Sequence, residues 1–195
     1  MKRLALLTGI LALAAPLAVA QTSAQISTWT TDSAHSEVDF TVKHLSISNV
    51  HGRFGKVAAT MTWNEADPTK STVKATIDVT TLSTGEAPRD THLKSPDFFE
   101  ADKFPTATFA STSVAKTGAG LKVTGDLTLK GVTKPVVLDV EGPTAPVQGM
   151  DKKLHSGFAA STTIQRTDFG IGSKFPDTMV SDKVILTIDL DFAKQ

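Results

Sequence analysis

The sequence contains no cysteine and no tyrosine among its 195 residues. Without cysteine there are no disulfides, no thiolate metal sites and no thiol catalysis, so a folded chain must take its stability from a hydrophobic core. Basic residues and acidic residues both number 20, and neither kind forms a block. This balance argues against partners such as nucleic acid or an anionic membrane surface.

A long apolar run occurs only at the beginning of the chain. Lys2 and Arg3 precede an apolar stretch over residues 4–17, and small residues follow at 18–20. This order is typical of a cleavable secretory signal, and the apolar stretch is too short for a membrane span. We therefore expect residues 1–20 to be a signal peptide, with no integral membrane segment after its removal.

Removal of that segment would leave 18 basic and 20 acidic residues in the mature domain, residues 21–195. A bacterial periplasm is the expected location, although the signal does not distinguish periplasm from medium. Repeats and linkers are missing, so we expect one domain.

Alternation of apolar and polar residues dominates the mature sequence, and helical periodicity is nearly absent. Over residues 184–192 the even-numbered positions are apolar, whereas Thr187, Asp189 and Asp191 point the other way. Similar alternation occurs at residues 38–42, 57–63, 73–79, 107–114, 121–129, 136–140 and 154–164. Turn residues such as Asp67-Pro68 and Gly142-Pro143 separate the runs. The pattern predicts eight or nine strands joined as an antiparallel meander.

The alternation stops between Gly85 and Phe104. We expect a short helix near residues 87–94 and a further turn at 96–100, which together would cap one end of the sheet.

Strands of this number and length must bury one continuous apolar face. We therefore predict an all-β fold, a single extended antiparallel β-barrel of about eight strands with a short helical cap. A two-sheet sandwich is less suitable, because sandwich strands tend to be shorter. Small residues occupy several inward positions, namely Ala59, Ala75, Ala107, Gly125 and Ala160. They are consistent with a cavity and equally with a filled barrel whose small residues sit at tapered ends.

Six segments together resemble the YceI-like family of polyisoprenoid-binding, lipocalin-like proteins. They are Asp32-Ser33-Ala34-His35-Ser36-Glu37-Val38, Val42-Lys43-His44-Leu45 with Gly52-Arg53-Phe54, Arg89-Asp90-Thr91-His92-Leu93-Lys94-Ser95-Pro96-Asp97-Phe98-Phe99, Phe104-Pro105-Thr106-Ala107-Thr108-Phe109, Gly125-Asp126-Leu127-Thr128-Leu129-Lys130-Gly131-Val132-Thr133-Lys134-Pro135 and Arg166-Thr167-Asp168-Phe169-Gly170. Their order and spacing cover nearly all of residues 28–193. The resemblance is weakest over residues 173–182, so nothing is inferred for that loop.

The resemblance implies a lipocalin-like, lipid-binding β-barrel over residues 21–195 that holds an isoprenoid chain, such as a quinone tail or a polyprenyl phosphate, for storage or transport. The expected partner is thus a long-chain isoprenoid lipid, and no other cofactor is expected. The residues that we expect to bind this ligand are Phe40, Val42, His44, Phe54, Ala75, Ile77, Arg89, His92, Phe98, Phe99, Phe109, Phe158, Ala160 and Phe169.

The polar members of this set have alternative roles. Arg89 and His92 would share a helix face and could meet a lipid head group, but Arg89 could equally pair with a carboxylate and pin the cap. His35 and His44 are expected near a rim, fixed by backbone hydrogen bonds. Arg166 and Asp168 are expected to form a pair that stabilises a bulge.

Catalytic and metal sites find little support in the sequence. The five histidines show no H-x-H or H-x-x-x-H spacing, so we expect no metal. No G-x-S-x-G motif is present, and we expect a protein that is not an enzyme. Two alternatives stay open: a barrel enzyme acting on an isoprenoid or fatty substrate through His44 or Arg89, and a filled barrel acting as a stress or partner-binding module. The sequence also leaves a homodimer open.

Overall fold

The computed structural model describes residues 25–118 and 120–195, so the expected signal peptide lies outside the described residues. The strands are β1 (Ile26–Thr31), β2 (Glu37–His44), β3 (Ser48–Phe54), β4 (Val57–Asn64), β5 (Thr72–Asp78), β6 (Leu82–Ser83), β7 (Thr106–Lys116), β8 (Leu121–Leu129), β9 (Val132–Glu141), β10 (Val147–Gln148), β11 (Leu154–Gln165) and β12 (Lys183–Lys194). The helices are α1 (Ala87–Lys94) and three short 3₁₀ turns, η1 (Pro68–Lys70), η2 (Val79–Thr81) and η3 (Arg166–Phe169). Among the described residues, no helix has both the length and the apolar character to cross a bilayer.

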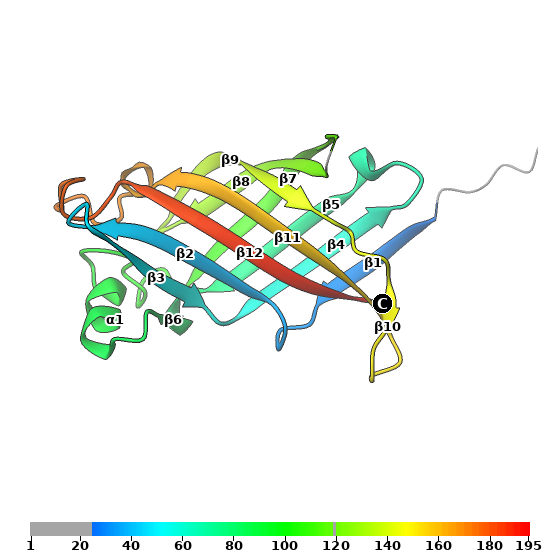
Figure 1. The fold of residues 1–195 in the computed structure, drawn as a ribbon, viewed down its shortest axis with the longest axis horizontal. Coiled ribbons are helices and arrows are strands. Elements are labelled where there is room, and N and C mark those ends of the chain that lie inside the picture. Colours follow the sequence, from blue (N-terminus) through cyan, green and yellow to red (C-terminus); the bar gives the residue numbers. More distant parts are fainter. Residues whose placement is uncertain (1–24, 119) are drawn as a thin grey trace, which may run out of the picture.

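The strands form one closed antiparallel barrel with eight strand positions around its circumference, as predicted. Three of these positions are each shared by two short strands. β1 and β2 lie one after the other along the same edge of β12, and β3 and β4 continue each other in the next position. β5 and β6, which η2 links, follow each other along the edge of β4 and β3. β7, β8, β9, β11 and β12 complete the ring. Figure 1 shows a long barrel with α1 beside one end and the C terminus at the other.

The alternation in the sequence corresponds to the two faces of the wall. β8 alternates between buried and more accessible residues along its whole length, with Leu121, Val123, Leu127 and Leu129 buried. The interruption at residues 85–104 forms helix α1 and a turn after it, as expected. The cap therefore sits where the strand pattern ends.

The ladders of the barrel differ in length. β11 and β12 are paired over eleven residues and β8 and β9 over nine, but β9 and β11 are paired only at residues 139–141 and 159–161. Pro135 lies in the part of β9 without a partner on the β11 side. Proline has no N–H to donate, so it is tolerated at such an edge. The wall is least strongly bonded here.

The small inward residues only partly leave space. A Cβ on Gly125 would lie 2.4 Å from the Phe109 ring, so this ring fills the gap that the glycine leaves. Ala59 packs in a cluster with Trp29, Met61 and Phe192. Of the two alternatives that the small residues left open, the filled one therefore applies at these two positions, because aromatic neighbours from other strands pack there.

The expected Arg166–Asp168 pair is also not formed. Arg166 is 3 % exposed, and its guanidinium donates to the carbonyls of Ile171, Gly172, Phe175, Val180 and Ser181. All five N–H donors of the side chain are thus used. Asp168 is exposed. Arg166 therefore holds the segment between η3 and β12 in place.

Replacement of Arg166 by glutamine should lower the free energy of unfolding by about 2–4 kcal/mol, because several buried carbonyls lose a charged donor. Urea denaturation of the purified protein measures this. Arg53→Gln is the matched control, because Arg53 is exposed and pairs with the partly exposed Glu37 at 3.1 Å. The effect of this control on the free energy of unfolding should stay below about 0.5 kcal/mol. Equal losses in the two variants would contradict the assigned role of Arg166.

Candidate functional site

The barrel interior contains two apolar cavities that adjoin each other. The outer chamber, on the side of the cap, has a volume of about 310 Å³, and the inner chamber about 140 Å³. Val38, Ile77, Leu127 and Leu186 line both, so the two chambers lie next to each other along the barrel, and we call them together the channel. The larger volume is at the lower end of the range typical of small-molecule sites. The interior is therefore hollow.

Polar side chains on the channel wall gather in the outer chamber. His44 at the end of β2, Arg89 and His92 on α1, and Arg166 after β11 line this chamber, and the rest of its wall is apolar. In the inner chamber the polar side chains are the hydroxyls of Ser71, Thr72 and Thr162. None of the described residues that line either chamber is Asp or Glu. The channel thus has a basic, partly polar end and a long apolar end.

Arg89 is held by the segment before α1, not by a carboxylate as the sequence had suggested as one alternative. Its Nε donates to the Thr84 hydroxyl at 2.7 Å, and Nη2 donates to the Thr84 carbonyl at 3.0 Å. Asp90 accepts hydrogen bonds from the amide and hydroxyl of the same threonine. Burial opposes ionisation of Asp90, but these bonds outweigh it and lower its pKa. Thr84 therefore fixes the helix at the chamber.

Aromatic rings join the cap to the barrel. The Phe98 ring stacks on Phe175 with centroids 4.9 Å apart, and the His92 ring meets both edge-on at 5.0 and 5.8 Å. Phe99 packs edge-on against Phe54 at 5.7 Å. These rings close the side of the outer chamber under α1.

The inner chamber extends toward the opposite end of the barrel. Ala75 on β5 and Ala160 on β11 line it, together with the Phe109 ring. Phe158 contacts Trp63 and Phe192 edge-on, with centroids 5.9 and 5.6 Å apart, and all three rings are part of the wall. The aromatic group marks the apolar end of the channel.

The structure brings thirteen of the fourteen expected ligand-binding residues to the channel. The outer chamber has Phe40, Val42, His44, Phe54, Ile77, Arg89, His92, Phe98 and Phe99, and the inner chamber has Ala75, Phe109, Phe158 and Ala160. Phe169 is 2 % exposed and packs in the core behind η3, outside both walls. Contact of the fourteen residues with a ligand stays a prediction.

Several wall residues were not anticipated. Phe175, Met179 and Val180 come from the segment after η3, where the sequence shows no strand pattern and the family resemblance is weakest. Val180 forms an isolated bridge with His44, which brings the segment to the chamber. Leu186, Ile188 and Leu190 also line the channel, and the alternation of β12 would have identified them.

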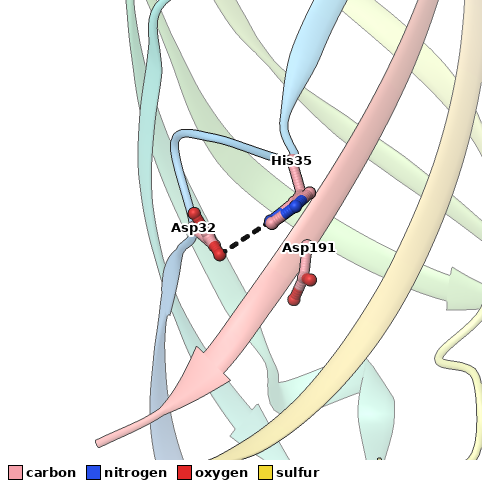
Figure 2. Close-up of side chains that lie close together, drawn as sticks. All are labelled: Asp32, His35 and Asp191. Carbon is pink, nitrogen blue, oxygen red and sulfur yellow. Dashed lines mark hydrogen bonds and ion pairs between the residues drawn. The ribbon is translucent and has the colours of Figure 1, made fainter. Parts of the chain in front are cut away.

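A second polar cluster lies at the other end of the barrel (Figure 2). His35 Nδ1 lies 2.9 Å from an Asp32 carboxylate oxygen, and ligand-type atoms of Asp32, His35 and Asp191 all lie within 4.8 Å of one another. The hydrogen bond to Asp32 raises the pKa of His35, and His35 in turn lowers the pKa of Asp32. The expected backbone hydrogen bond of His35 is thus replaced by a carboxylate contact.

His155 joins this cluster to the neighbouring hairpin. Its Nδ1 lies 2.8 Å from Asp191 and its Nε2 lies 3.1 Å from Asp151. The hydrogen bonds to Asp191 and then to Asp151 raise the pKa of His155. Imidazole and carboxylate groups are ligands that divalent zinc accepts, but here they already pair with one another. The absence of a metal site stays a prediction.

Comparison with known proteins agrees with this architecture. A family model described as a YceI-like domain matches residues 29–192. Protein YceI of Escherichia coli O17:K52:H18 is 39% identical over 157 residues, which is 80% of this chain and 81% of that protein. The crystal structure of the Campylobacter jejuni YceI protein has a TM-score of 0.70 at 34% identity and covers 78% of this chain and 90% of its own.

A third comparison is more distant. A domain from Saccharophagus degradans, described as a polyisoprenoid-binding domain implicated in plant cell wall breakdown, has a TM-score of 0.62 at 16% identity. The match covers 88% of this chain and all of that domain. At this identity the likeness shows a common fold.

The raised pKa of His155 makes part of the stability dependent on pH. The charged imidazolium is favoured in the folded state, so its contribution is fully present below the unfolded pKa of about 6.5 and is lost as pH rises through the higher folded value. We expect the melting temperature to fall between pH 6 and pH 8.5, and to fall less in His155→Gln. Calorimetric scans at both values measure this.

His51→Gln is the control for this experiment, because His51 contacts the Thr41 hydroxyl at 3.0 Å and no carboxylate is paired with it among the described residues. The melting temperature of this control should fall between pH 6 and pH 8.5 as much as that of the wild type. A His155→Gln variant with the full wild-type decrease would show that the two aspartates do not couple to His155.

Proposed function

The chain belongs to the YceI-like family, and from this membership we propose that it binds a long-chain apolar lipid, a polyisoprenoid such as a quinone tail or a polyprenyl phosphate, inside the barrel. The observation that carries the proposal is the pair of adjoining apolar chambers inside the barrel. Storage or transport of the lipid through an aqueous compartment is the corresponding role. Residues 1–20 would direct export, and the periplasm is the proposed location.

The polarity of the channel fits an amphiphile with one head and one long tail. His44, Arg89 and His92 offer cationic or hydrogen-bonding groups at the outer chamber, where a phosphate or quinone ring would sit. The tail would extend along the apolar wall toward Phe158 and Trp63. The Saccharophagus relative is described as polyisoprenoid-binding, and this supports the choice of ligand class.

Burial of the tail supplies enough free energy for binding without a strong polar anchor. Each isoprene unit has five carbons and contributes about 3–4 kcal/mol when moved from water into an apolar channel. A few units therefore yield roughly 10 kcal/mol or more, and after the cost of immobilising the chain is subtracted this leaves enough for micromolar to nanomolar affinity. Affinity should thus increase with tail length until the channel is full.

We propose binding without chemistry. General acid–base catalysis needs a group with a suitable partner beside the substrate, and no carboxylate lines the described walls. Turnover of an isoprenoid or fatty substrate that disappears in His44→Ala or Arg89→Ala would favour the enzyme alternative.

Native mass spectrometry of gently purified protein tests the proposal most directly. We expect an adduct whose mass matches an isoprenoid lipid, or uptake of a long polyprenyl lipid added to the empty protein. A protein that carries no lipid and takes up none would overturn the proposed function.

Filling the inner chamber should shorten the tail that can bind. In Ala75→Trp and Ala160→Trp, the indole would occupy space on the inner wall, so affinity for a long polyprenyl chain should fall at least about tenfold, while a ten-carbon chain binds as in the wild type. Ala58→Trp is the matched control, because Ala58 neighbours these strands but is exposed on the outer face. Equal uptake by all three variants would refute the assigned position of the tail.

A further inference from the structure

Three large apolar side chains lie exposed at the open end of the channel. Leu45, Ile47 and Met179 are 49, 80 and 41 % exposed, and we call them the mouth patch. The Leu45 amide donates to the Met179 carbonyl at 2.8 Å, so the β2–β3 turn and the segment before β12 are joined here. Met179 also lines the outer chamber. The mouth patch is therefore continuous with the channel wall.

The turn that displays Leu45 and Ile47 has an unfavourable sequence for its shape. Leu45 and Ser46 have φ values of 51° and 58°, and the Ile47 amide donates to the His44 carbonyl at 3.0 Å. Asparagine and glycine are the residues usually found at two such positions. A leucine here is disfavoured both by its backbone conformation and by its exposure to water. Its presence points to a state in which the side chain leaves water.

The mouth patch is held in position by the rest of the fold. Arg166 donates to the carbonyls of Val180 and Ser181, next to Met179, and Ser181 exchanges hydrogen bonds with the backbone of Lys43. The backbone on both sides of the mouth patch is therefore tied to the barrel. Figure 1 places this hairpin at the end of the barrel opposite the C terminus.

We propose that the mouth patch inserts into the interfacial region of a phospholipid bilayer, so that a lipid moves between the membrane and the outer chamber without crossing water. This inference rests on the proposed function, because only a membrane lipid as ligand gives the contact a purpose. The charges beside the patch, Lys43 and Asp177, have opposite signs and are both exposed. Insertion would thus depend on apolar burial, and a zwitterionic membrane suffices.

The decisive variant combines Leu45→Asn, Ser46→Gly and Ile47→Gln, none of which lines either chamber. The first two changes suit the turn, so the melting temperature should be equal or higher, and loss of binding would not reflect misfolding. The matched control is Val147→Asn with Met150→Gln. Val147 and Met150 are 64 and 104 % exposed at the other end of the barrel and line neither chamber.

Flotation with phosphatidylcholine vesicles, at low and high salt, measures membrane binding of the purified protein. We expect the wild type and the control to float at both salt concentrations, and the triple variant to bind at least tenfold more weakly. The triple variant should also extract a fluorescent polyprenyl lipid from the vesicles at least tenfold more slowly. It should bind the same lipid normally when the lipid is added from ethanol without a membrane.

Wild-type protein that does not float, or a triple variant that floats as the wild type does, would overturn the membrane contact. Self-association of the wild type that is lost in the triple variant, without flotation, would assign the patch to a second copy of the chain and overturn it equally. Failure of the wild type to bind the lipid added from ethanol would instead overturn the proposed function, since that measurement involves no membrane.

Discussion

The pairing of β11 with β12 is the interaction on which the rest of the structure depends. It joins residues 155–165 to residues 183–193 and turns an open sheet into a ring. A sheet with one apolar face must hide that face, and closure does so without a second layer. In a ring of eight strands the inward side chains approximately fill the interior, so a few small or displaced side chains decide whether a channel remains. Here two adjoining chambers remain.

The two ends of the barrel are organised differently. At one end, helix α1, the aromatic contacts of Phe98 and Phe175, and the buried Arg166 build an irregular structure around a basic opening. At the other end, His155 of β11 joins Asp191 of β12 to Asp151 of the preceding loop, while aromatic rings meet on the inside. The channel therefore has a direction, and an amphiphilic ligand would have one preferred orientation.

The strands and the cap could be predicted from the sequence, because period-two alternation and its interruption are local signals. Ala75 and Ala160 were assigned to the interior correctly on the same basis. It was harder to predict which side chains contact one another in that interior. The sequence left open whether Gly125 leaves space, because the ring that fills it comes from β7, and cross-strand neighbours depend on register. Arg166 was expected to pair with Asp168, whereas its partners are backbone carbonyls in a loop without any periodic pattern. Such contacts follow from the closed fold as a whole.

The short pairing between β9 and β11 has a consequence for the width of the barrel. Most ladders would lose many backbone hydrogen bonds if their strands separated, but here only three residue pairs connect the two strands. Separation along this line costs less than anywhere else around the circumference, since the free energy of local opening depends on how many contacts are broken. The wall is thus opened most easily along this line, while the ladders around the rest of the ring keep their register.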